Sequence, residues 1–279
     1  DFEDTLFCME ATGLYCFPLT QFLAANSISI WIEHAAQIKK ATALARGKND
    51  KVDSKRIAMY AIKNLDRLRL WRPMDATLEK IKHLASLRER LVETKKKLTT
   101  PIKEFEEVGN VTMAKLLTKT IKASLAAIEK DLKNIEANII SIVNEDDNLK
   151  LLYKLITSVV GIGFVTAINL LVHTNAFTVL KDTRKLACYC GVAPFEYSSG
   201  SSIRGKTKVH YMANKKLKCN LHMASLSAIK LDADLKTYYE RKVNEGKNKM
   251  SVLNAVKNKL LARVIAVVNK QQEYVKRTA

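Results

Sequence analysis

Two short stretches, TLFCME at residues 5–10 and ISIWIE at residues 28–33, decide the fold of the first part of the chain. The first is an apolar run that ends in an acid, and the second alternates isoleucine with other residues, as a half-buried strand does. Between them, Tyr15 to Asn26 has the apolar spacing of a helix. This order of strand, helix and strand predicts an α/β unit over residues 1–66.

Residues 76–147 have a different character, with no strand pattern and many Lys, Glu and Leu residues. In the second half of this segment apolar residues step by four and three, which is a heptad seam. They are Ile121, Leu125, Ile128, Leu132, Ile135, Ile139 and Ile142. Because Gly109 and Asn110 form a natural turn before this run, we expect an antiparallel coiled-coil hairpin. The seam leaves open whether the hairpin packs on itself or on another subunit.

Residues 148–279 are expected to form a mainly helical domain. Two helical patterns flank the turn VGIG at residues 160–163, and two amphipathic helices follow a Ser/Gly-rich loop. Residues 155–180 carry no charged side chain, but Gly161, Gly163 and Asn175 interrupt them, which disfavours a membrane span. The whole chain is therefore predicted to be α/β followed by all-α.

The formal net charge of +19 indicates a polyanionic partner. From Asn148 to the end there are 23 Lys and Arg against 7 Asp and Glu, so this partner should meet the C-terminal half. Between Lys181 and Lys218, nine of these cations alternate with three tyrosines, a mixture that favours a nucleic-acid surface over a merely solvated face. The residues we expect to contact nucleic acid are Gly161, Gly163, Arg204, Lys206, Lys208, Lys215 and Lys216.

The two glycines are included because backbone N–H groups of a helix-hairpin-helix turn can receive a DNA phosphate. A turn between two helices with no ligand fits Gly161 and Gly163 equally well. The five cysteines are an odd number in a chain of this size, which favours a reducing compartment. Cys188 and Cys190, with His210 and His222, do not complete a usual zinc pattern.

Three acids and one serine are candidates for chemistry. Glu10 ends an apolar strand, where a carboxylate can hold Mg²⁺, although a surface acid near a helix start is the simpler interpretation. Asp50 and Asp53 are three residues apart and so share a helical face, but Asp50 as an N-cap and Asp53 as a first-turn acid explain them as well. Ser199 lies on the Ser/Gly-rich loop beside cations that suit attack on a phosphodiester, but such a loop is usually only solvated.

Taken together, these motifs resemble the DEDD-type transposases of insertion sequences. The segments EATGLY at 10–15 and KNDKVD at 48–53 are similar to the second half of that family's RuvC-like (RNase H-like) domain. The segments VGIG at 160–163, LACYCGVAP at 186–194 and SSG at 198–200 are similar to its C-terminal transposase domain, and KNKLL at 257–261 fits its last helix. The family includes the Piv-type DNA invertases and the recombinases guided by a bridge RNA.

The resemblance implies a partial RuvC-like domain at 1–66, a coiled-coil stalk at 67–147 and a DNA-binding domain with the serine nucleophile at 148–279. It implies that Glu10, Asp50 and Asp53 are three of four Mg²⁺-binding acids, and that Ser199 attacks DNA to form a transient phosphoserine link. It also implies a homodimer or homotetramer joined through the coiled coil, DNA as partner, and a possible guide RNA. The expected location is the cytoplasm of a bacterium or archaeon, at the nucleoid.

The family's first acid has no counterpart in this sequence, so we expect weak or absent cleavage from residues 1–279 alone. Two other interpretations stay open at this point. One is a non-catalytic nucleic-acid-binding protein or an inactive truncated copy, which would bind in a salt-sensitive way without cleavage. The other is a RuvC-like nuclease that hydrolyses DNA through activated water, for which Ser199 would be dispensable.

Overall fold

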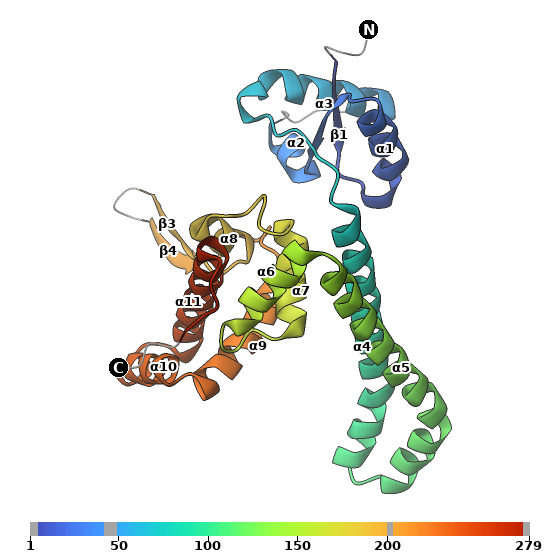
Figure 1. The fold of residues 1–279 in the computed structure, drawn as a ribbon, viewed down its shortest axis with the longest axis vertical. Helices are drawn as coiled ribbons and strands as arrows, with labels where there is room; N and C mark the ends of the chain where they lie inside the picture. Colours follow the sequence, from blue (N-terminus) through green and yellow to red (C-terminus); the bar gives the residue numbers. More distant parts are fainter. Residues whose placement is uncertain (1–4, 42–48, 200–202, 276–279) are drawn as a thin grey trace. The chain divides into compact units, whose positions relative to one another are not determined.

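The computed structural model describes residues 5–41, 49–199 and 203–275, which form two compact units on either side of the bond between Met74 and Asp75 (Figure 1). Each unit is described by itself. The first contains β1 (Leu6–Glu10), η1 (Gly13–Cys16), α1 (Phe17–Ala25), β2 (Ser29–Glu33), α2 (Ala35–Ala41), α3 (Asp50–Lys63) and η2 (Leu65–Arg67). The predicted strands, and a helix between them, are confirmed.

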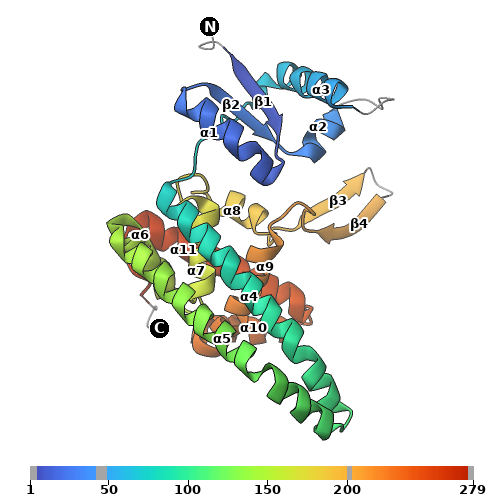
Figure 2. The same ribbon diagram turned by 90° about the vertical axis from the view of Figure 1, so that its right-hand side faces the viewer.

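The two strands of the first unit run parallel, with Leu6 opposite Ser29 and Glu10 opposite Glu33. A parallel pair needs a crossover connection, and α1 provides it. Figure 2 shows α1 on one side of the strands and α2 with α3 on the other. The core contains Trp31 and Tyr60, whose ring centroids lie 5.5 Å apart. This core fixes α3 against the strands.

The second unit contains eight helices and one strand pair in the part of the chain described. They are α4 (Ala76–Glu107), α5 (Val111–Glu145), α6 (Asp147–Ser158), α7 (Phe164–Thr174), α8 (Thr183–Tyr189), β3 (Phe195–Ser199), β4 (Ile203–Lys208), α9 (Lys215–Leu231), α10 (Ala233–Asn244) and α11 (Lys249–Lys270).

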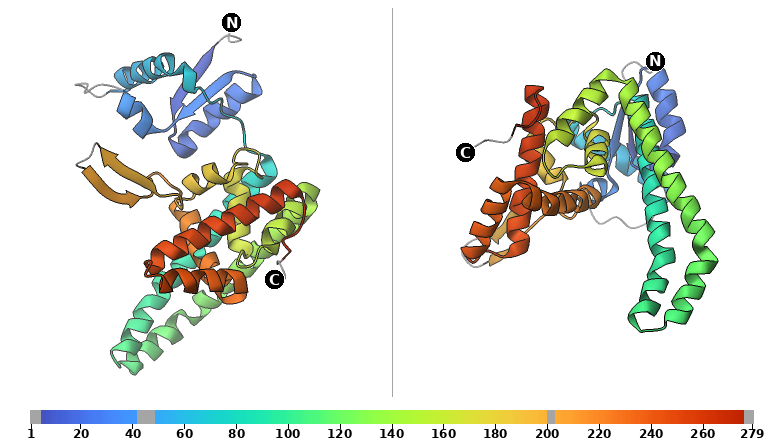
Figure 3. Two further views of the ribbon diagram at one scale, coloured as in Figure 1. Left: turned by 90° about the vertical axis from the view of Figure 1, so that its left-hand side faces the viewer. Right: turned by 60° about the horizontal axis from the view of Figure 1, so that its bottom comes forward.

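Helices α4 and α5 form the predicted hairpin, which reverses at residues 108–110 (Figure 3). Two ion pairs fix its register: Arg88 Nε lies 2.7 Å from Glu136 Oε1, and Lys95 Nζ lies 2.7 Å from Glu129 Oε1. One heptad forward on α4 is therefore one heptad backward on α5, as an antiparallel seam requires. The helical hairpin is confirmed, whereas its pairing with another subunit stays a prediction.

The hairpin belongs to the same compact unit as the C-terminal helices, although the sequence predicts it as a separate stalk. Helix α4 packs against α7, and α5 is followed directly by Asp146, whose carboxylate caps the start of α6 by accepting from Leu149 N–H at 2.9 Å. A heptad pattern shows that a helix has an apolar seam, but it does not show that the hairpin also packs against the helices that follow it. In this unit α7 is central, because eight of its eleven residues are buried. No described helix combines the length and hydrophobicity needed to cross a membrane.

One prediction in this unit is wrong. The segment expected to be a Ser/Gly-rich loop contains an antiparallel strand pair, β3 and β4, with Phe195 opposite Lys208 and Ser199 opposite Ile203. Residues 200–202, between the strands, lie outside the described residues. The side chains of the pair that the structure describes are exposed, among them Phe195 at 50%, so these residues form no buried apolar face. Without apolar alternation the sequence gives no strand signal.

Candidate functional site

The first candidate region is the edge of the sheet where β1 and β2 end. Because the strands are parallel, Glu10 and Glu33 come to this edge side by side. Glu33 is held in place: its Oε1 accepts from the His34 backbone N–H at 2.7 Å, and its Oε2 accepts from the Tyr60 hydroxyl at 3.0 Å. Burial and the hydrogen bond to Glu33 raise the pKa of Tyr60. Sequence reasoning missed Glu33, although both strands end in the same acid.

The second pair of candidate acids lies at the start of α3. Asn49 is the N-cap, since its side chain accepts from the Val52 N–H at 2.8 Å, and Asp50 is the first helical residue rather than the cap. The Asp53 carboxylate lies 2.8 Å from Arg56 Nη1, with its side chain 40% exposed. Both acids lie in the first turn, where the exposed N–H groups favour negative charge.

These acids do not form a metal-binding group as they stand. Among the residues described, no three His, Cys, Asp or Glu side chains lie close enough together to hold a metal ion. The predicted ligands Glu10, Asp50 and Asp53 therefore do not by themselves fit a Mg²⁺ site, in which several oxygen ligands must converge. An ion pair to Arg56 also competes for Asp53. The strand register places only Glu10 and Glu33, among the described acids of this unit, opposite each other.

Ser199 is the last residue of β3, so the serine lies at the end of a strand pair next to its connection. On the opposite strand, Arg204, Lys206 and Lys208 occupy alternate positions of β4. The pairing is irregular between the pairs Phe195–Lys208 and Tyr197–Gly205, so the regular alternation of β4 is interrupted between Gly205 and Lys208. The backbone thus brings the candidate nucleophile to the same strand pair as three predicted nucleic-acid contacts.

The glycine turn between α6 and α7 has a structural explanation for one of its glycines. Gly161 has a φ of +94°, and a β-carbon at this position would lie 2.6 Å from the Ala224 carbonyl oxygen of α9. Gly163 is different: no atom lies within 4 Å of its hypothetical β-carbon, and it begins α7 without a side-chain cap. Close packing therefore explains Gly161, whereas Gly163 leaves the first N–H groups of α7 without a side-chain acceptor.

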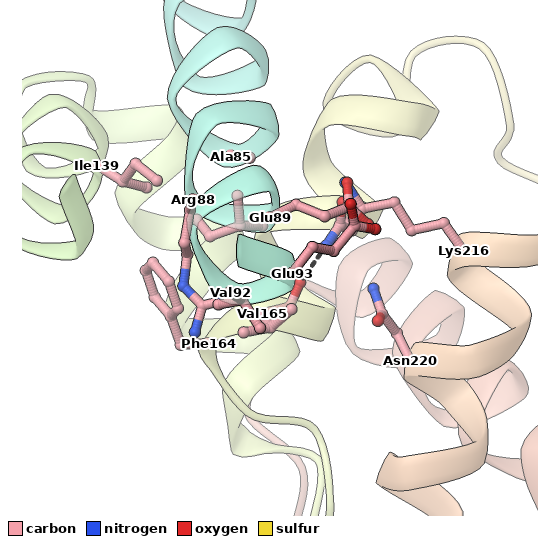
Figure 4. Close-up of a pocket in the computed structure, with 12 residues that line it drawn as sticks. Ala85, Arg88, Glu89, Val92, Glu93, Ile139, Phe164, Val165, Lys216 and Asn220 are labelled. Atoms are coloured by element: carbon pink, nitrogen blue, oxygen red, sulfur yellow. Dashed lines mark hydrogen bonds and ion pairs between the residues drawn. The ribbon is translucent and has the colours of Figure 1, made fainter. Parts of the chain in front are cut away.

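The predicted contact Lys216 takes part in an ion pair inside the protein. Its Nζ lies 2.6 Å from Glu89 Oε2 across a pocket of about 250 Å³ between α4, α7 and α9 (Figure 4). The Arg88 guanidinium lies 6.0 Å above the ring of Phe164 on another wall of this pocket. Lys216 thus joins α9 to α4 as well as adding positive charge to the surface.

A polar cluster next to this ion pair was not predicted from the sequence. His173 lies in the last turn of α7, Tyr189 ends α8, and Asn214 caps α9. The Tyr189 hydroxyl lies 3.2 Å from His173 Nδ1, and Asn214 Nδ2 lies 3.3 Å from both of those atoms. Burial, followed by Lys216 and Lys82, lowers the pKa of His173. The three residues are 16 and 25 positions apart, so no local pattern connects them.

Comparisons with known proteins give the class to which these features belong. Residues 1–105 match a family model described as "Transposase", for DEDD transposases of the IS110 type, and residues 153–240 match the model "Transposase IS116/IS110/IS902 family". The matches place the acids in one transposase region and Ser199 in the other. The chain is also 29% identical over 138 residues to the "Insertion element IS110 uncharacterized 43.6 kDa protein" of Streptomyces coelicolor. That match covers 50% of this chain and 33% of the relative.

Both parts of the chain thus carry a transposase signature. Both matches are to models of IS110-type transposases, and together with the relative they support an IS110-family DEDD transposase.

Proposed function

We propose that this protein cuts and rejoins DNA strands during transposition, with Ser199 as the nucleophile. The observation that carries the proposal is the match of both chain segments to transposase families, together with the position of Ser199 on a strand pair whose other strand is basic. Charge supports it independently, because the net positive charge lies mainly in the half that contains Ser199.

In the proposed step, the Ser199 oxygen attacks a phosphorus atom of the DNA backbone. A phosphoserine ester forms as the bond from phosphorus to one deoxyribose oxygen breaks, and the serine proton ends on that leaving oxygen. Cations at Arg204, Lys206 and Lys208 would stabilise the negative charge that develops on the phosphate oxygens. The reverse attack by a deoxyribose hydroxyl rejoins the strand and restores the serine.

The proposal keeps Glu10, Asp50 and Asp53 as this chain's contribution to a Mg²⁺ site, on the strength of the family resemblance alone. Magnesium would supply charge stabilisation at the reacting phosphate. Because the acids present do not converge, no step of the mechanism is derived through the metal. A RuvC-like fold for the first unit, oligomerisation through α4 and α5, a guide RNA and a location at the bacterial or archaeal nucleoid are proposed on the same basis.

The test is a covalent adduct. The protein as its gene encodes it is mixed with end-labelled DNA of its element, Mg²⁺ and any cognate RNA, and denaturing electrophoresis separates protein-linked DNA. We expect the adduct to form with the unaltered protein and with Ser198→Ala, and to disappear with Ser199→Ala. Ser198 is a matched control because it is the preceding residue of the same strand, opposite Arg204.

Each alternative has its own outcome in this experiment. An adduct that persists in Ser199→Ala contradicts the assignment of the nucleophile. Cleavage without any adduct, unaffected by Ser199→Ala, favours a RuvC-like nuclease. Salt-sensitive DNA binding with neither cleavage nor adduct favours a non-catalytic binding protein or an inactive copy.

A further inference from the structure

The cluster of His173, Tyr189 and Asn214 has more hydrogen-bond donors than acceptors. The Asn214 carbonyl oxygen is already used, because it accepts from the Leu217 N–H at 3.0 Å. The Asn214 amide donates to the Tyr189 oxygen at 3.3 Å. His173 Nδ1 has a single lone pair, yet both the Tyr189 hydroxyl and the Asn214 amide lie within 3.3 Å of it.

At least one of these two hydrogens therefore has no acceptor inside the cluster. A neutral imidazole that accepts at Nδ1 carries its own proton on Nε2, which adds a second donor. The cluster is accessible, since Tyr189 is 36% exposed. A ligand that completes the hydrogen bonding of this cluster must consequently supply acceptor atoms.

The charges around the cluster favour a negative ligand. The ionisable groups that act on His173 are Lys216 on α9 and Lys82 and Glu89 on α4, two cations against one carboxylate. Glu89 and Lys216 pair with each other at 2.6 Å, so the positive charge left among these three groups is that of Lys82. An acceptor with negative charge, such as a phosphate oxygen, is the chemistry that suits this combination of donors and cations.

The cluster also adjoins the strand pair that carries Ser199. Tyr189 lines a cavity together with Phe195, the first residue of β3, and with His210, Met212 and Ala213, which follow β4. Ala213 directly precedes Asn214. A phosphate bound at the cluster would thus lie at the base of the strand pair, where a continuous DNA strand could extend along it.

We propose that His173, Tyr189 and Asn214, with Lys82 and Lys216 beside them, bind one backbone phosphate of a DNA strand. The site rests on the proposed function, because it holds the same strand on which Ser199 would act. It is a positioning site rather than a catalytic one. Free inorganic phosphate offers the same oxygen acceptors as a DNA backbone phosphate, so the test compares the two.

The most informative variant is Asn214→Asp. Aspartate caps a helix as well as asparagine does, so α9 keeps its N-cap, while the amide donor is replaced by a charged acceptor. Asn248→Asp is the matched control, because Asn248 caps α11 in the same unit by accepting from Met250 N–H at 2.9 Å and brings the same change of charge. Thermal unfolding checks that both variants remain folded.

Binding of the 279-residue chain to a fluorescent duplex and to a single strand is measured by anisotropy, without Mg²⁺, over a series of salt concentrations. Losing one phosphate contact lowers the slope of log affinity against log salt by about 1 and weakens binding about tenfold at low salt. We expect both changes for Asn214→Asp and neither for Asn248→Asp. Tyr189→Phe, which keeps the ring beside His173, should give a smaller weakening of two- to fivefold.

The proposal fails if Asn214→Asp and Asn248→Asp have the same affinity and the same salt slope. It also fails if inorganic phosphate at matched ionic strength displaces the DNA at low millimolar concentration, because the site would then favour the free anion. If the unaltered chain binds no DNA, both this site and the proposed function are contradicted. If the Asn214→Asp effect is found but no Ser199 adduct forms, only the proposed function is contradicted.

Discussion

Gly161 lies so close to α9 that a β-carbon at this position would come within 2.7 Å of the Ala228 Cβ. The two residues are 67 positions apart, and their contact joins the turn before α7 to the last turn of α9. We predict that Gly161→Ala destabilises the second unit by about 2–3 kcal/mol, because it adds a clash to a left-handed backbone conformation. Urea unfolding followed by circular dichroism measures the loss.

Gly163→Ala is the control for that prediction. Its backbone is extended and its surroundings are open, so the change should lower the free energy of unfolding by less than about 1 kcal/mol. The start of α7 should keep its backbone conformation. Equal stability losses for the two variants would contradict the packing explanation of Gly161.

A second prediction concerns Asp232, which is 3% exposed and lies 2.7 Å from Arg263 Nη1 on α11. Its other carboxylate oxygen caps α10 by accepting from the Leu235 N–H at 3.0 Å. Removing one partner leaves a buried charge uncompensated, so Asp232→Ala should cost about 3–5 kcal/mol. Asp232→Asn keeps a capping oxygen and should cost less. If the two variants unfold at the same denaturant concentration, the capping oxygen of Asp232 does not contribute separately from the ion pair with Arg263.

A third prediction follows from Lys257, which is 4% exposed on α11 and forms no ion pair with any carboxylate in the described part of the chain. Burial, and next the nearby Lys218, lower the pKa of this ammonium below its usual 10.5. Between the lowered pKa and 10.5, the unfolded chain binds more protons at this position than the folded chain does. Stability from this residue therefore rises as the pH rises through that window.

Lys257→Met removes this dependence while keeping a side chain of similar length. We expect the variant to be more stable than the unaltered chain by about 1 kcal/mol at pH 7, and the difference to shrink as the pH approaches 10.5. The measurement is the free energy of unfolding of both proteins from pH 7 to pH 10. A difference that stays constant over this range would refute the explanation.

A fourth prediction concerns the order in which the cysteines react. Burial raises the pKa of Cys190 to about 12, and burial with the nearby Glu33 carboxylate raises that of Cys8 to about 11, whereas Cys219 is exposed. Since the thiolate is the reactive form, iodoacetamide at pH 8 should modify Cys219 first and Cys190 last. Peptide mass spectrometry at successive times gives the order, and early labelling of Cys190 in the folded protein would contradict it.

The sequence predicts some elements well because their signals are local. The α4–α5 hairpin follows from apolar spacing and the turn at Gly109, and β1 and β2 follow from two apolar runs that both end in glutamate. The strand pair that carries Ser199 has no such signal, because exposed strands do not need an apolar face. Apolar patterns in a sequence indicate which residues are buried, whereas β3 and β4 are held together by backbone pairing.

The candidate sites divide in the same way. Glu10, Asp50 and Asp53 are visible as acids at element ends, but the strand register alone reveals that Glu33 lies beside Glu10. His173, Tyr189 and Asn214 meet because α7 packs on α9 and the Asn214 N–H donates to the Tyr189 carbonyl oxygen at the end of α8, a relationship that no periodicity encodes. Residue type and spacing identify candidates, whereas packing decides which of them meet.

The helix caps of the second unit bear on how it folds. Seven of its eight helices, as far as the chain is described, begin with an Asp or Asn whose side chain accepts a backbone N–H; the exception is α7, which begins at Gly163. A capped helix can start forming from its own residues, whereas α7 depends on the surfaces that α4, α6 and α9 present to it. We therefore expect amide hydrogens of α7 to gain protection last in a refolding experiment, after those of the seven capped helices of the unit.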